Sequence, residues 1–112
     1  MQIGEQRLDG VIVLAPTGRI DSTTSDELDR ALGHALDAGE RRVIIDFGAV
    51  EYISSAGLRV LLVAGKRIRT GHLVLCSLTE PVRQVFDLAG FLPLFAIERS
   101  RESALARLAG TD

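Results

Sequence analysis

Apolar residues along this chain alternate between short strand-like runs and longer helix-like stripes. The first two runs, 2–8 and 11–14, flank Asp9-Gly10, a dipeptide that accepts the positive φ angles of a type I′ turn. The chain is therefore predicted to open with a hairpin. Later runs rich in β-branched and aromatic residues predict further strands at 43–47, 73–77 and 94–97.

Between these runs, apolar residues recur three and four positions apart, which places them on one face of a helix. Thr24 and Glu27 fit a capping box for the first helix, and Gly39 ends it. The predicted helices begin after Thr24, Ser54 or Ser55, Thr79 and Ser100, and the first three end at Gly39, Gly71 and Gly90. The third helix is expected to turn inward Val82, Val85, Phe86 and Ala89.

This order of elements predicts the fold class. Strands that alternate with helices after an opening hairpin give an α/β domain with a mixed sheet of about five strands and about four helices. Pro16, Thr17 and Gly18 interrupt the second strand, so it should bend or leave the ladder there. The 112 residues fit a single domain, 1–112, and can bury a core without disulfides or a metal.

Charge and hydropathy limit the classes of function that the chain can have. A formal charge of -2, with no basic aromatic patch, disfavours direct nucleic-acid binding. No apolar run approaches the roughly 20 residues needed to cross a bilayer. Because the N-terminus also lacks the pattern of a signal peptide, we expect a cytoplasmic protein that does not bind membranes.

The cysteine and histidine residues predict no metal site. Cys76 is the single cysteine, so it forms no internal disulfide, and its apolar neighbours indicate a small buried side chain. His34 and His72 are isolated and have no Cys or His neighbour at ligand spacing, so both are expected at the surface. The sequence therefore predicts neither a metal nor another cofactor.

Two polar segments should meet at one edge of the sheet. The loop at Asp21 precedes the first helix, and the turn at Ser54 joins a buried strand to the second. If the strands before them are parallel, both segments lie at the carboxyl edge. We predict a single partner-binding surface made of Asp21, Ser22, Thr23, Ser54, Ser55, Ala56, Gly57 and Leu58.

The serines and the glycine of this turn each allow two interpretations. Ser54 or Ser55 would cap the second helix, because a serine oxygen accepts an N–H that the first turn leaves unpaired. A serine there also lies beside the positive end of the helix dipole, where a phosphate is tolerated. Gly57 either gives a partner room to approach or is simply tolerated at a helix start.

The residues around this turn resemble a known signature. Asp46-Phe47, Val50 and the stretch from Tyr52 to Leu58 are similar to the STAS domain, a family named for sulfate transporters and anti-sigma factor antagonists. Leu75-Cys76-Ser77 and 85–90 extend the resemblance over nearly the whole chain. Within the family the chain resembles the antagonists in which one serine at this turn is phosphorylated by a kinase that is also the anti-sigma factor.

The resemblance implies a STAS-like fold, with helices mostly on one face, and a partner-switching function. Unmodified protein would bind an anti-sigma factor and so free a sigma factor, and phosphorylation would prevent this. The matching serine is Ser55, with Ser54 as the second choice, because many antagonists carry an aspartate where this chain has Ser54. The implied partners of this monomer are an anti-sigma factor with serine kinase activity and a serine phosphatase.

No catalytic constellation is recognisable, so we predict a protein that is not an enzyme. The chain has no P-loop, and Ser55 is not in a Gly-x-Ser-x-Gly elbow. One alternative is a receiver-like domain phosphorylated on Asp46, although Pro16-Thr17-Gly18 stands where such a domain needs an acidic pair for Mg²⁺. Another is a constitutive STAS subunit of a transporter or larger signalling assembly, which would use the same surface without a switch.

Overall fold

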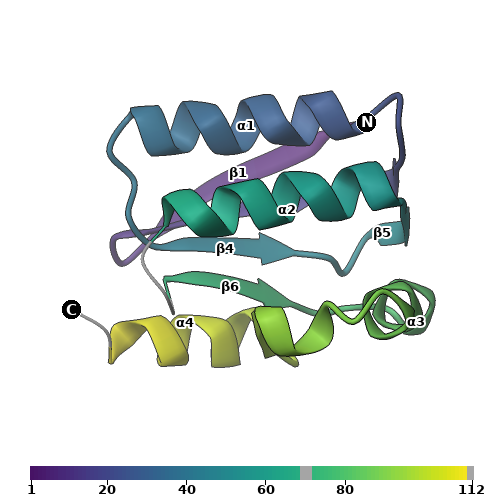
Figure 1. Cartoon of the computed structure of the whole chain (residues 1–112). Coiled ribbons are helices and arrows are strands. Elements are labelled where there is room, and N and C mark those ends of the chain that lie inside the picture. The colour runs from purple at the N-terminus through teal and green to yellow at the C-terminus, as the bar shows by residue number, and fades with distance from the viewer. Residues whose placement is uncertain (69–71, 111–112) are drawn as a thin grey trace.

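In the computed structural model, which describes residues 1–68 and 72–110, a mixed five-stranded sheet forms the centre of the domain (Figure 1). Its strands, in spatial order, are β1 (Ile3–Leu8), β2 (Val11–Pro16), β4 (Val43–Asp46), β6 (Leu73–Cys76) and β7 (Ala96–Glu98). β1 is antiparallel to β2, and the other neighbouring pairs are parallel. The predicted mixed sheet with an opening hairpin is confirmed.

A second, two-stranded sheet begins where β2 ends. Gly18, with φ of 88°, directs the chain out of the main ladder into β3 (Gly18–Ile20). β3 pairs in parallel with β5 (Val50–Ile53). The departure of the chain near Pro16 was predicted from the sequence. β5 was not, because the sequence pattern placed its residues in the turn before the second helix.

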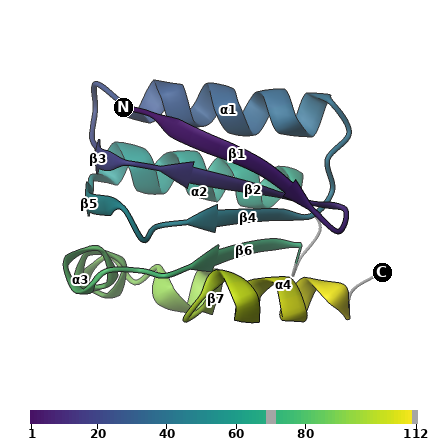
Figure 2. The same cartoon turned by 180° about the vertical axis from the view of Figure 1, so that it is seen from behind.

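Within the described residues, four α-helices cover the sheets: α1 (Ser25–Asp37), α2 (Ser55–Arg67), α3 (Glu80–Leu88) and α4 (Arg101–Ala109). α1 and α2 lie side by side on one face of the large sheet, and α4 lies on the other (Figure 1 and Figure 2). α3 packs against β5, where the Thr79 hydroxyl donates to the carbonyl of Val50 at 3.2 Å. A short 3₁₀ helix, η1 (Leu92–Leu94), precedes β7.

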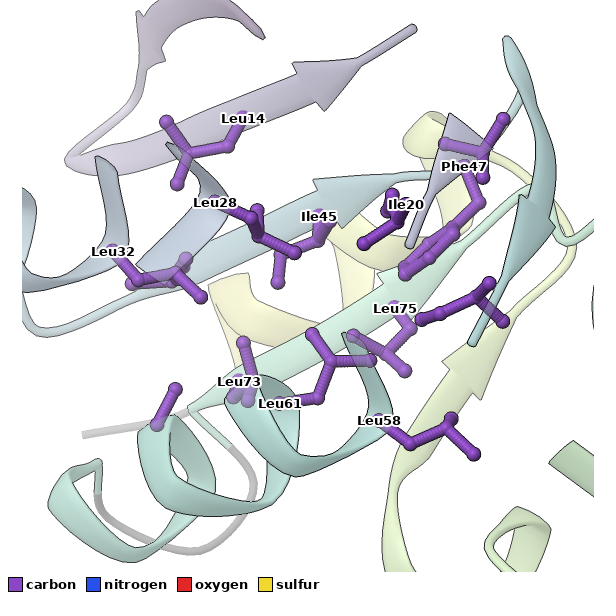
Figure 3. Packing of buried hydrophobic residues seen from close by; sticks show 14 of the residues in the cluster. Leu14, Ile20, Leu28, Leu32, Ile45, Phe47, Leu58, Leu61, Leu73 and Leu75 are labelled. Carbon is purple, nitrogen blue, oxygen red and sulfur yellow. The ribbon is translucent and has the colours of Figure 1, made fainter. Parts of the chain in front are cut away.

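The main core lies between the large sheet and the α1–α2 layer (Figure 3). Ile45 and Leu75 point into it, whereas their neighbours Ile44 and Val74 face α4, as expected for side chains that alternate along a strand. Ile20 belongs to the main core and is fully buried. The β3–β5 ribbon is therefore attached to the domain by its own apolar side chains.

The start of α1 differs from the sequence prediction, and the start of α4, at the predicted position, has a capping box that was not predicted. Thr24 and Glu27 do not form a capping box: the Thr24 side chain caps nothing, and its hydroxyl donates instead to the carbonyl of Arg19 at 2.7 Å. Glu27 lies 3.7 Å from the amino group of Met1. A true capping box occurs at α4, where Ser100 and Ser103 each accept a hydrogen bond from the backbone N–H of the other.

Two details of burial and one strand boundary also differ from the sequence prediction. His72 is buried, with 7% of its surface exposed; it lies directly before β6, and its carbonyl accepts the N–H of Val43 at 2.9 Å. Ala89 is exposed because it is the C-cap of α3 and lies beyond the last turn of the helix that has a buried side chain. Leu94 lies in η1 and not in the last strand. The expected helix end at Gly71 lies outside the described residues.

No helix in the described parts of the chain is both long and apolar enough to span a membrane.

Candidate functional site

The β3–β5 pair brings the two polar segments together. Ile20 is the register partner of Ile53, and the N–H of Ser54 donates to the carbonyl of Ile20 at 2.8 Å. Asp21 and Ser54 therefore directly follow the ends of two adjacent, parallel strands. The sequence predicted this meeting at one sheet edge, but the strands that produce it are those of the small sheet.

The loop after β3 is organised by one carboxylate. Asp21 Oδ1 accepts hydrogen bonds from the Thr23 hydroxyl at 2.7 Å, the Thr23 N–H at 2.9 Å and the Thr24 N–H at 3.2 Å. These bonds, led by that of the hydroxyl, lower the pKa of Asp21 below its ordinary value of 3.8. The Asp21 carboxylate thus holds its own loop together by hydrogen bonds, so its replacement would change the conformation of the loop as well as the charge.

Ser54 and Ser55 have different surroundings. Ser54 is the N-cap of α2, and its Oγ accepts the N–H of Gly57 at 3.4 Å. Ser55, the first helical residue, is exposed, and its hydroxyl makes no hydrogen bond to any described residue. The first turn of α2 contains no acidic side chain. Ser55 therefore presents a free hydroxyl at the positive end of a helix.

The other turn residues lie progressively deeper. Ala56 is half-buried, and Gly57 and Leu58 are buried, with Leu58 4% exposed. A Cβ on Gly57 would lie 2.7 Å from both Ile20 Cγ2 and Ile53 Cγ1. A side chain at position 57 would therefore crowd the domain's own core, a reason for glycine that neither interpretation of the sequence included.

Removing the cap of α2 should cost little stability. Ser54→Ala is expected to lower the free energy of unfolding by about 0.5–1 kcal/mol, the low end for an N-cap, because its hydrogen bond is long. Ser55→Ala is the matched control. It removes a hydroxyl that has no partner, so it should change that free energy by less than about 0.5 kcal/mol. Denaturant unfolding measures both, and equal losses would contradict the assignment of Ser54 as the cap.

Comparison with known proteins gives the family of this fold. The family model described as "STAS domain" matches residues 3–104. The chain belongs to the STAS domain family. Its relatives include the "Putative anti-sigma factor antagonist BtrV" of Bordetella bronchiseptica, which is 43% identical over 108 residues, 95% of this chain and 93% of BtrV.

Solved structures share the STAS fold. A crystal structure of an anti-sigma factor antagonist from Mycobacterium paratuberculosis has a TM-score of 0.89 and 24% identity, over 96% of this chain and 93% of that one. The antagonist SpoIIAA in its unphosphorylated form has a TM-score of 0.82 and 19% identity, over 99% of each chain. Bacillus SpoIIAA in its phosphorylated form has a TM-score of 0.71 and 18% identity, over 96% of this chain and 99% of that one.

Asp46 ends a central strand of this STAS domain, but its carboxylate is already engaged. Oδ2 accepts Arg101 Nε at 3.1 Å and lies 3.0 Å from Nη2, while Oδ1 accepts the Gly48 N–H at 2.9 Å. An acyl phosphate on Asp46 would replace either the contact of Oδ1 with Gly48 or that of Oδ2 with Arg101. Cys76, at the end of the neighbouring strand, is buried as predicted, and burial raises the pKa of its thiol to about 11.

Sequence reasoning missed one pair of residues beside the candidate surface. Arg19 on β3 is the register partner of Tyr52 on β5, and its guanidinium carbon lies 4.4 Å from the centroid of the tyrosine ring. The short run of β-branched and aromatic residues from Val50 to Ile53 could have indicated a strand. Its pairing with β3, however, carried no signal in the sequence.

Proposed function

We propose that this STAS domain is an anti-sigma factor antagonist switched by phosphorylation of Ser55. The observation that carries the proposal is the exposed Ser55 hydroxyl, which makes no hydrogen bond to a described residue and lies on the first turn of α2, beside the Asp21 loop. Two comparisons support it: BtrV bears the name of such an antagonist, and SpoIIAA has been solved both without and with phosphate.

The unmodified surface binds an anti-sigma factor and so separates it from its sigma factor. Asp21, Ser22, Thr23, Ser54 and Ser55 would form its outer part, with Ala56 partly and Gly57 and Leu58 wholly beneath it. The anti-sigma factor, acting as a serine kinase, transfers phosphate to Ser55, and a serine phosphatase removes it. The STAS domain itself acts as a cofactor-free, non-catalytic monomer in the cytoplasm.

Phosphate incorporation tests the assignment of the switch. Each kinase-like anti-sigma factor encoded by the source genome is purified and incubated with labelled ATP and the domain. The wild-type and Ser54→Ala proteins are expected to incorporate phosphate, whereas Ser55→Ala should incorporate none yet still bind. The label should resist hydroxylamine, which would release an acyl phosphate from Asp46.

Each other outcome has a definite meaning. Incorporation into Ser55→Ala but not Ser54→Ala would move the switch to Ser54. Binding of an anti-sigma factor without any phosphorylation would favour the constitutive STAS subunit. Failure to bind any of the purified anti-sigma factors would overturn the proposed function.

A further inference from the structure

The outer face of the β3–β5 ribbon carries an arginine side chain that is held by an aromatic ring, beside the Asp21 loop and the Ser54–Ser55 turn. Arg19 is exposed and stacks on the half-buried ring of Tyr52, with 4.4 Å between the guanidinium carbon and the ring centroid. Each residue lies two positions before the start of one polar segment, at Asp21 and Ser54. The pair is therefore continuous with the proposed binding surface.

The backbone beneath Arg19 is fixed by the same loop. Its carbonyl accepts the Thr24 hydroxyl at 2.7 Å, and that hydroxyl also accepts the N–H of Asp21 at 2.9 Å. The position of Arg19 is thus tied to the conformation of the Asp21 loop. Stacking on Tyr52 further restricts the side chain before any partner arrives, which reduces the entropy lost on binding.

The guanidinium has no polar partner within the described residues, a state that Arg19 shares with other exposed arginines such as Arg30 and Arg59. Arg7, Arg67 and Arg107 each pair with a carboxylate at 2.6–2.9 Å, and Arg101 binds Asp46. Arg19 makes no ion pair or side-chain hydrogen bond with a described residue. Asp21, close by in the chain, uses its Oδ1 within its own loop. The contact with Tyr52 leaves the guanidinium N–H donors without an acceptor among the described residues, and a carboxylate is the group that accepts two such donors at once.

A partner seated on Ser55 would also cover Arg19. A standard protein interface buries about 800 Å² on each side, a patch about 30 Å across. The two shorter dimensions of this domain are 24 and 23 Å. An interface of that size that includes Ser55 and the Asp21 loop therefore reaches the β3–β5 ribbon, whose strands end directly before both segments.

We propose that Arg19, held by Tyr52, determines partner specificity by pairing with a carboxylate on the anti-sigma factor. This inference rests on the proposed function and adds to it the chemistry of the partner. Partners that place an acidic side chain opposite Arg19 are accepted, and those that place a basic one there are rejected by like-charge repulsion.

The test measures the affinity of Arg19 variants for the anti-sigma factor kinase that binds the wild-type domain in the preceding experiment. Arg19→Glu should weaken binding by at least about tenfold. Arg19→Lys should weaken it by less, because lysine keeps the positive charge but cannot donate two parallel hydrogen bonds to a carboxylate. Tyr52→Leu should weaken binding by a smaller factor through loss of the stack. Arg30→Glu, the same charge change on the exposed face of α1, is the control and should leave affinity within about twofold.

Charge exchange makes the result specific. Each exposed Asp or Glu of the anti-sigma factor is changed to Lys, and one such variant should restore binding to Arg19→Glu. The inference is overturned if Arg19→Glu binds like wild type, if Arg30→Glu loses as much affinity, or if no exchange restores binding. In those cases the proposed function stands, since wild type still binds and accepts phosphate; if wild type binds no anti-sigma factor, both fail together.

Discussion

Phosphoserine at position 55 is expected to weaken binding of the anti-sigma factor more than a hundredfold while the domain stays folded. The phosphate adds nearly two negative charges and three acceptor oxygens to an exposed position in the centre of the proposed surface. Burying an uncompensated charge in an interface costs about 3–5 kcal/mol, and about 3 kcal/mol already corresponds to more than a hundredfold in affinity.

The fold should tolerate the same phosphate. The first turn of α2 carries no acidic side chain, and the positive end of a helix stabilises an anion by about 0.3–1 kcal/mol. The melting temperature of the phosphorylated domain should therefore be unchanged or slightly raised. The loss of affinity would then belong to the interface and not to unfolding.

Calorimetric titration of the domain with phosphoserine installed at position 55 measures this effect directly. Phosphoserine in place of Ala106, exposed on α4 across the sheet, supplies the same charge away from the surface and should leave affinity unchanged. Ser55→Asp should reproduce part of the loss, because it carries one charge and fewer acceptors. A loss of less than about fivefold for the phosphorylated domain, or an equal loss at position 106, would contradict this switch.

The central layers of the fold could be predicted from the sequence because each is built from a repeating apolar pattern. The strands β2, β4 and β6 are runs of mostly buried residues, and α1 and α2 carry apolar stripes that face the sheet. The Asp9-Gly10 turn followed from local backbone chemistry, and both residues have positive φ, at 53° and 79°. The spacing of apolar residues and the type of a turn are local properties of the sequence, so they can be predicted without knowledge of distant contacts.

The parts that could not be predicted depend on contacts between distant segments. β5 has only four residues, buried at its ends and more exposed between them. Its residue types favour a strand, but it has no alternating pattern, and its pairing with β3 could not be predicted. Thr24 and Glu27 fit a local capping motif, but the Asp21 loop and the carbonyl of Arg19 engage the threonine hydroxyl instead. Both differences fall beside the candidate surface, where the small sheet shapes the two loops.

Gly57 gives the sharpest case of a residue whose role appears only in the folded structure. Gly57→Ala would place a Cβ 2.7 Å from side-chain carbons of Ile20 and Ile53, both fully buried, so one of them must move. Overpacking of this kind costs about 1–3 kcal/mol, and the better helix propensity of alanine returns at most about 1 kcal/mol. We expect a net loss of about 1–2 kcal/mol in the free energy of unfolding.

Gly65→Ala, in the same helix, is the matched control for Gly57→Ala. A Cβ at position 65 would make ordinary contacts, 3.8 Å from Phe95 Cε1 and 4.0 Å from Leu73 Cδ2. That substitution should therefore stabilise the domain by up to about 1 kcal/mol, the opposite sign. Thermal unfolding of the two variants separates internal crowding from a general response of the helix to alanine. If Gly57→Ala instead kept the wild-type melting temperature and lost only anti-sigma factor binding, the crowding would lie in the interface, and Gly57 would be a close-approach residue for the partner.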